Sequence, residues 1–487
     1  MDNKKSYKQI IKSTAVFGST QAMQMLVLII RTKIVAVILG PAGMGLQSIF
    51  QTTIITINQF TNLGVFQSAI REISQAHEKQ DTILLKRKIN IFCGLTIILA
   101  ITGTLIFASL SPIISKISFG NYKYTSSFLF LSISILFLTL STGITTIFQG
   151  TREIRKLTKS SLISSVSNLL ICLPIFYLWG INGIIPALVI GYFTTFLINI
   201  FTLNNFKITG QIPLRSIWQE SIPMIKLGVI LMLSNLLMNL FTFLTNSYIS
   251  INGNIEDVGL YQSACSITNR NILVIISVLA SDYYPRLAGS CNDSSLMKQI
   301  INQQVELISL IIAPLSICLI VFSEQIVHIL LSNSFYVIIP MLKWMGVALL
   351  FRGIWMSMSY VILAKGDKKN YFIYDALVGN GLYFLSNITF YLYWGLNGLG
   401  ISFLISSILI AILLLTIVYR KYNIRFTLSF IINFGIQLSL CILVLFISNQ
   451  NMNKGTYYTL CFPILIISIY HAMYTIIKRT GFKINIK

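Results

Sequence analysis

Charged residues are scarce in this sequence, and acidic residues are the scarcest of all. Asp, Glu, Lys and Arg together make up 10% of the 487 residues, whereas soluble domains usually carry about 25%. Only 14 residues are acidic against 36 that are basic, and 55% of the chain is hydrophobic. A chain with so few charges has too little polar surface for water, so the composition excludes an ordinary soluble domain and indicates a membrane protein.

Motifs of enzyme and metal chemistry are missing as well. None of the seven cysteines stands in a C-x-x-C pair, so the sequence predicts neither a disulfide framework nor a zinc site. It contains no G-x-x-x-x-G-K-[ST] phosphate loop, no H-E-x-x-H and no serine nucleophile elbow. We therefore expect no metal and no cofactor, no transport driven by a phosphate-loop ATPase within this chain, and no enzyme activity.

The sequence does contain a series of long apolar runs. About 20 apolar residues cross a bilayer as a helix, and the alternating pattern of a membrane β-barrel is not visible. The runs predict an all-α polytopic membrane protein with 14 transmembrane helices, near residues 12–39, 44–70, 89–111, 125–149, 160–179, 182–203, 222–249, 257–284, 301–322, 338–363, 371–394, 397–419, 426–448 and 456–477.

The basic residues give these spans an orientation. Twenty-eight of them fall at the two ends of the chain and in every second connection, while the other connections hold only Lys116, Lys123 and Lys454. Because Lys and Arg accumulate on the cytoplasmic side of membrane proteins, we expect both termini to be cytoplasmic. The net charge of +22 is then a topology signal and a contact for anionic lipids, and it requires no nucleic-acid partner.

An internal repeat divides the spans. The motif W-G-x-N-G occurs at residues 179–183 and again at 394–398, which is 215 positions later. At nearly the same offset, Gly45-Leu46 matches Gly259-Leu260. Each half then holds six spans and enters the membrane in the same sense. We predict a six-helix lobe at residues 1–210, a second at 211–422, and two additional helices at 423–487.

Three arginines lie inside predicted spans, where a cation is costly and usually faces a bundle interior or a wet cavity. They are Arg31, Arg270 and Arg352, and neither Arg270 nor Arg352 has an acidic residue at the same predicted depth. The planar guanidinium binds two oxygens of a phosphate at once. We therefore interpret all three as candidates for binding an anionic substrate, with bracing of the second half as the alternative for Arg352.

Amide side chains form stripes at helical spacing on the first two spans of each half. Such stripes have two interpretations: they hydrogen-bond helices to one another, or they line a shared polar cavity. We expect the cavity. The candidate substrate-binding amides are Gln24, Gln51, Asn58, Asn235, Asn239, Gln262 and Asn269.

Two acidic residues are candidates for coupling transport to an ion. Asp375 is predicted near the cytoplasmic end of the eleventh span and Glu306 near that of the ninth. An ionisable residue inside a membrane is a functional-site hypothesis by default, so either could bind a proton or sodium. Glu306 could equally be an interfacial residue without such a role.

Four segments carry a resemblance to a known family. L-G-P-A-G-M-G-L at residues 39–46 resembles the G-P-x-G-x-G turn of bacterial flippases for lipid-linked oligosaccharides, whose type members move O-antigen units or enterobacterial common antigen. E-D-V-G-L-Y-Q-S at 256–263 is similar to the entry of that family's eighth span. L-L-S-N-S-F at 330–335 and V-I-L-A-K-G at 361–366 resemble its tenth-span region.

The resemblance implies the fold of the multidrug/oligosaccharidyl-lipid/polysaccharide exporters, with two six-helix lobes in a V and a cationic cavity. It implies a flippase of the bacterial inner membrane that moves undecaprenyl-diphosphate-linked glycan, such as an O-antigen unit for lipopolysaccharide, by alternating access. Glycan polymerase machinery is then a further expected partner. Two rivals stay open: a multidrug exporter of the same superfamily, which would favour buried acids, and a membrane glycan polymerase or ligase.

Overall fold

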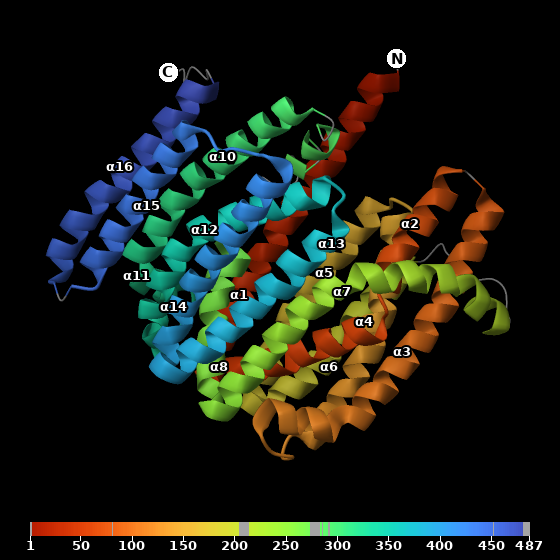
Figure 1. The fold of residues 1–487 in the computed structure, drawn as a ribbon. Coiled ribbons are helices and arrows are strands. Elements are labelled where there is room, and N and C mark those ends of the chain that lie inside the picture. Colours follow the sequence, from red (N-terminus) through yellow and green to blue (C-terminus); the bar gives the residue numbers. More distant parts are fainter. Residues whose placement is uncertain are drawn as a thin grey trace. The chain divides into compact units, whose positions relative to one another are not determined.

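The computed structural model describes residues 2–79, 81–203, 214–272, 283–284, 286–290, 293–450 and 452–480, and every regular element among them is helical. The chain forms two compact units, Met1–Gly259 and Leu260–Lys487. Figure 1 shows the helices of both units. The predicted all-α class is confirmed for this part of the chain.

The first unit is a helical bundle around a core of aromatic rings. Phe50 packs edge-on against Phe119 and Phe128, with ring centroids 6.1 and 5.4 Å away, so three helices meet at one point. The elements of this unit are α1 (Asp2–Thr61), α2 (Val65–Glu78), α3 (Thr82–Phe119), α4 (Thr125–Gly150), α5 (Ile154–Trp179), η1 (Gly180–Gly183), α6 (Ile184–Leu203), α7 (Leu214–Asn252) and the first part of α8 (Ile255–Cys265).

The second unit is organised around two long buried helices, α10 and α12. Helix α12 packs against α14, while α15 and α16 lie side by side against α10 (Figure 1). The described elements of this unit after α8 are η2 (Ser266–Ile272), α10 (Ser294–Val321), α11 (Ser323–Leu330), η3 (Asn333–Ile338), α12 (Ile339–Ala364), α13 (Lys368–Asn370), η4 (Tyr371–Gly379), α14 (Asn380–Tyr422), α15 (Leu428–Ser448) and α16 (Lys454–Thr480).

Nine helical stretches among the described residues are long and apolar enough to cross a membrane, so the chain is a multi-pass membrane protein. Three of them, Ala22–Thr61, Ile154–Leu203 and Tyr371–Tyr422, are 40, 50 and 52 residues long, about twice what one crossing needs. Each is interrupted at a glycine with positive φ: Gly40, Gly180 or Gly395. These glycines lie where the sequence predicts short turns between neighbouring spans.

The two W-G-x-N-G turns have the same backbone geometry. Gly180 has φ 52° and ψ −131°, and Gly395 has φ 55° and ψ −139°, a region that L side chains rarely adopt. The last glycine of each motif is crowded by the carbonyl oxygen eight residues earlier: a Cβ on Gly183 would lie 2.7 Å from that of Ile175, and one on Gly398 would lie 2.0 Å from that of Phe390. The two halves of the sequence therefore repeat at atomic detail in these turns.

Helix α7 belongs to the first compact unit because it packs on α1, α2 and α3. Gly64 and Gly228 allow this: a Cβ on Gly64 would lie 2.0 Å from the Gly228 carbonyl oxygen. The compact units consequently divide after residue 259, whereas the predicted boundaries at 210 and 422 refer to the sequence repeat and stay predictions.

Candidate functional site

A polar cavity of about 390 Å³ lies inside the first unit, between α1, α4, α5 and α6. Helix α1 contributes Gln24 and Arg31 to its wall, as their seven-residue spacing on one helical face predicts. The other polar lining residues come from α4, α5 and α6: Ser141, Thr142, Thr145, Ser161, Ser164, Ser165, Asn168, Thr195 and Asn199.

Amide–hydroxyl hydrogen bonds hold the helices around this cavity together. Asn168 Nδ2 donates to Thr195 Oγ1 at 3.0 Å, which joins α5 to α6. Asn199 Nδ2 donates to Ser141 Oγ at 2.6 Å, which joins α6 to α4. Gly191 permits the close approach of α5 and α6, since a Cβ there would lie 2.3 Å from Asn168 Oδ1. The wall is thus a fixed frame of hydroxyl and amide groups.

Two polar atoms of the cavity lining are buried without a hydrogen-bond partner. They are Arg31 Nε and Ser164 Oγ. The guanidinium of Arg31 does reach Cys172, and its charge also acts on Tyr192, but neither neighbour balances the charge. Among the described residues lining this cavity, none is acidic. Arg31 is half-buried and faces no carboxylate among these lining residues. A partly desolvated cation is stabilised by an opposite charge, so the cavity is suited to an anionic or hydroxyl-rich ligand.

Two of the candidate amides of the first unit connect helices. Asn58 Nδ2 donates to Thr139 Oγ1 at 2.8 Å and thereby joins α1 to α4. Asn239 Nδ2 donates to Gln59 Oε1 at 2.9 Å and joins α7 to α1. Gln51 is half-buried and Asn235 is exposed. For Asn58 and Asn239 the structure therefore shows helix-to-helix bonds, the simpler of the two interpretations of the stripes.

Three further candidates belong to the second unit. Gln262 on α8 is half-buried. Asn269 lies in η2, a π-helical segment, and its Oδ1 is buried without a hydrogen-bond partner. The side chain of Arg270 lies outside the described residues. The expectation that these residues share a cavity with Gln24 and Gln51 stays a prediction.

Arg352 is surrounded by aromatic rings. Its guanidinium carbon lies 4.7 Å from the ring centroid of Trp355, 5.1 Å from that of Phe403 and 5.8 Å from that of Tyr383. Cation–π contacts of this kind contribute most where the cation is desolvated. Arg352 therefore connects α12 to α14, which agrees with the bracing alternative.

Asp375 lies near the same arginine, in the π-helical segment η4. It accepts a hydrogen bond from Trp355 Nε1 at 2.6 Å and another from Ser359 Oγ. The charge of Arg352 acts on this carboxyl group. Because Asp375 bonds to Trp355 and Ser359, it lies one to two turns of α12 beyond Arg352, and the predicted difference in depth between the two charges stays a prediction.

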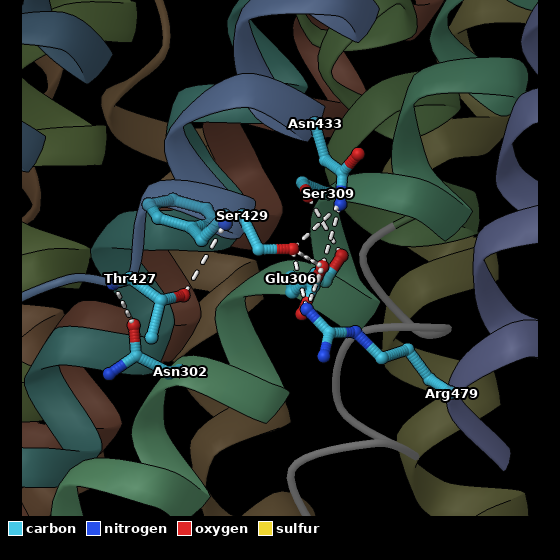
Figure 2. A network of polar contacts seen from close by, with 8 residues as sticks. Asn302, Glu306, Ser309, Thr427, Ser429, Asn433 and Arg479 are labelled. Carbon is cyan, nitrogen blue, oxygen red and sulfur yellow. Dashed lines mark hydrogen bonds and ion pairs between the residues drawn. The ribbon is translucent and has the colours of Figure 1, made fainter.

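Glu306 is held in a network of polar contacts, which Figure 2 shows. Its carboxylate accepts from Ser429 Oγ at 2.9 Å and from Asn433 Nδ2 at 2.6 Å, both on α15. Arg479 on α16 forms an ion pair with it at 3.4 Å. Glu306 therefore joins α10 to α15 and α16, and any proton or sodium would compete with three donors.

The hydroxyl and amide residues of α4, α5 and α6 were not among the sequence-predicted site residues. A signal was present on α5. Relative to Ser161, the residues Ser164, Ser165 and Asn168 stand three, four and seven positions later, so the four share one helical face. The sequence does not reveal which other helices this face meets.

Comparisons with known proteins agree with this fold. The chain matches the model of a family described as polysaccharide biosynthesis protein over residues 34–340. It is 19% identical over 352 residues to the lipid III flippase of Escherichia coli (strain K12), covering 70% of this chain and 82% of the flippase, and the figures for the Shigella flexneri protein are the same.

Solved structures show the same architecture. The lipid II flippase MurJ in an inward closed conformation matches with a TM-score of 0.73 at 15% identity, over 97% of this chain and 100% of that one. An inward-facing multidrug resistance MATE family transporter of the MOP superfamily matches with a TM-score of 0.71 at 17% identity, over 82% and 94%. The resemblance that the sequence motifs indicate is confirmed.

Proposed function

The chain belongs to the polysaccharide biosynthesis protein family, and from this premise we propose that it is a flippase that moves a lipid-linked glycan across the membrane. The family match and the similarity to the lipid III flippase of E. coli support this activity. The chain is then a transporter and not an enzyme, and a glycan polymerase or ligase is the weaker alternative.

The observation that carries the proposal is the Arg31 cavity. A lipid-linked glycan offers an anionic phosphate and many hydroxyl groups, and the cavity offers one cation and a wall of hydroxyls and amides. Arg31 Nε and Ser164 Oγ are the buried groups that such a ligand would pair. Charge-assisted hydrogen bonds to phosphate are about twice as strong as neutral ones, so Arg31 would contribute most to binding.

The finer features of the proposal rest on the sequence. The apolar runs support 14 spans in two six-helix lobes plus two additional helices, and the distribution of Lys and Arg supports cytoplasmic termini. A bacterial inner membrane follows from the resemblance. An undecaprenyl-diphosphate-linked substrate such as an O-antigen unit, and a glycan polymerase as partner, follow from the resemblance. Asp375 and Glu306 are the candidates for a proton or sodium site.

A multidrug exporter is the second candidate, because MATE transporters share the fold. A pump for organic cations would need an acidic residue in its binding cavity, since a buried cation needs an opposite charge. The described lining of the Arg31 cavity contains a positive charge and no acidic residue. The charge of this cavity therefore favours the flippase.

The test is a transport assay in proteoliposomes with two labelled substrates, an undecaprenyl-diphosphate-linked oligosaccharide and an organic cation. We expect movement of the first and none of the second. Arg31→Ala should lower the transport rate of the oligosaccharide about tenfold or more, because a charge-assisted hydrogen bond of about 1.5–3 kcal/mol is lost. Arg31→Lys should retain part of the transport rate, because lysine keeps the charge.

Lys33→Ala is the matched control, because Lys33 is a cation on the same helix two residues away but is not among the residues lining the cavity. It should transport at the normal rate. Movement of the cation alone, or normal transport by Arg31→Ala, would contradict the proposal.

A further inference from the structure

A second and larger cavity, of about 700 Å³, lies in the second unit beside the Glu306 network. It is bounded by α10, by α16 and by the segment that joins α14 to α15. Three of its lining residues are cations and one is an acid. The lining residues used below are Lys298, Asn302, Glu306, Leu310, Arg425 and Arg479.

Asn302 fixes the backbone that carries Arg425. The buried Asn302 side chain donates from Nδ2 to the Arg425 carbonyl oxygen at 3.1 Å and accepts at Oδ1 from the Thr427 backbone N–H at 2.8 Å. Figure 2 shows the second of these bonds. Thr427 also caps the N-terminus of α15. The connecting segment is therefore held against α10, with Arg425 at the edge of the cavity.

Glu306 holds Arg479 in place, but it does not neutralise the positive charge of the cavity. Arg479 uses its NH2 group both for the ion pair with Glu306 and for a hydrogen bond to Ser429 Oγ. A guanidinium carries five N–H donors, and the Arg479 side chain is 57% exposed. With Lys298 and Arg425 added, the cavity has three positive charges against one negative charge.

The position of the cavity in the chain fits the membrane surface. Lys298, Arg425 and Arg479 come from three different segments, and the distribution of basic residues predicts that all three lie at the cytoplasmic side. From this end α15 and α16 run on with exposed apolar side chains such as Ile431 and Met473, which in a membrane protein face lipid tails. Basic pockets between membrane helices on this side suit anionic head groups.

We propose that this cavity binds the phosphate head group of an anionic phospholipid of the cytoplasmic leaflet. Arg425, Arg479 and Lys298 contact the phosphate, and the acyl chains extend along the apolar faces of α15 and α16. Leu310 and the other apolar lining residues accommodate the glycerol end of the chains. The occupant is a component of the bilayer and not the transported glycan, so the proposal is independent of the flippase activity.

The test measures lipid binding to the full-length protein in detergent by native mass spectrometry, with phosphatidylglycerol as the probe and phosphatidylcholine as the uncharged comparison. We expect one tight phosphatidylglycerol site that phosphatidylcholine does not fill. Arg425→Gln or Arg479→Gln should each weaken it about fivefold, because a basic residue near an anionic head group contributes about 1 kcal/mol.

Lys478→Gln is the matched control, since Lys478 neighbours Arg479 on α16 but does not line the cavity. Its affinity for phosphatidylglycerol should equal that of the unaltered protein. Equal weakening by Lys478→Gln would mean that only the general surface charge matters, and it would overturn the proposal.

Glu306→Gln should change the affinity for phosphatidylglycerol in the opposite direction from Arg425→Gln and Arg479→Gln. Removing the one acid should tighten phosphatidylglycerol binding, because Arg479 is no longer paired with a carboxylate, while the glutamine oxygen still accepts from Asn433. A purely structural role of the network predicts weaker or unchanged binding and would contradict the proposal. Inorganic phosphate at millimolar concentration should not displace the lipid; displacement would assign the site to free phosphate.

Discussion

Two arginines with the same expected role have contrasting surroundings in the two units. Arg31 in the first unit faces a cavity of hydroxyls and amides and keeps a buried nitrogen without a partner. Arg352 in the second unit also has a buried nitrogen, Nη1, without a hydrogen-bond partner, but three aromatic rings enclose its guanidinium and the nearby Asp375 supplies an opposite charge. A cation inside a membrane protein thus indicates function only where its neighbours leave its charge unbalanced.

The largest effect that separates these arginines should be one of stability. Arg352→Met removes three cation–π contacts and the favourable charge interaction with Asp375, so it should lower the free energy of unfolding by about 2 kcal/mol or more. Arg31→Met should lower stability much less, because the Arg31 guanidinium reaches the Cys172 thiol and acts on Tyr192 through its charge but lines a cavity with no acidic residue among its described lining. Thermal unfolding of the purified variants measures both, and equal losses would abolish the contrast.

A smaller effect concerns the hydroxyl that shares the Arg31 cavity. Ser164→Ala removes a buried group that makes no hydrogen bond, so the protein should be as stable as before or slightly more stable. Transport should fall about fivefold if the hydroxyl binds substrate, since one hydrogen bond contributes about 1 kcal/mol. The proteoliposome assay described above gives the rate; an unchanged rate would leave Ser164 without a role.

An amide that connects helices should behave differently from the lining of the cavity. Asn58→Ala removes the bond to Thr139 and the bond that Asn58 Oδ1 accepts from Asn62, and it should cost about 1 kcal/mol of stability, since each such bond within a membrane contributes about 0.6 kcal/mol. The transport rate per folded molecule should not change. A lowered rate at normal stability would instead support the expected role of Asn58 in substrate binding.

The smallest effect involves a surface pair of the second unit. The ammonium of Lys421 lowers the pKa of the Asp367 carboxyl group, so the pair stabilises the folded protein above the usual carboxyl pKa and less as pH falls through the lowered value. An exposed pair contributes about 1 kcal/mol at most. The free energy of unfolding of Lys421→Gln should therefore equal that of the unaltered protein at low pH and be slightly lower at neutral pH. A difference between the two proteins that grew at low pH would contradict this assignment.

The sequence predicts the spans and the Arg31 face because both depend on periodicity within one helix. Gln24 and Arg31 are seven residues apart and line one cavity, as expected. The sequence does not predict that Asn168 and Asn199 complete this cavity, because the pairing of α5, α6 and α4 depends on packing between distant helices. It also does not predict the π-helical segments around Asn269 and Asp375, since no residue pattern marks them.

The W-G-x-N-G turns have a practical consequence for anyone who wishes to label this protein. Gly180 and Gly395 already use a backbone conformation that other residues rarely adopt, and Gly183 and Gly398 have no room for even one methyl group. An epitope or a protease site inserted between Trp179 and Gly183 would force two helices apart. Reporters belong instead in the longer connections, such as residues 120–124 between α3 and α4, where Tyr122 is exposed.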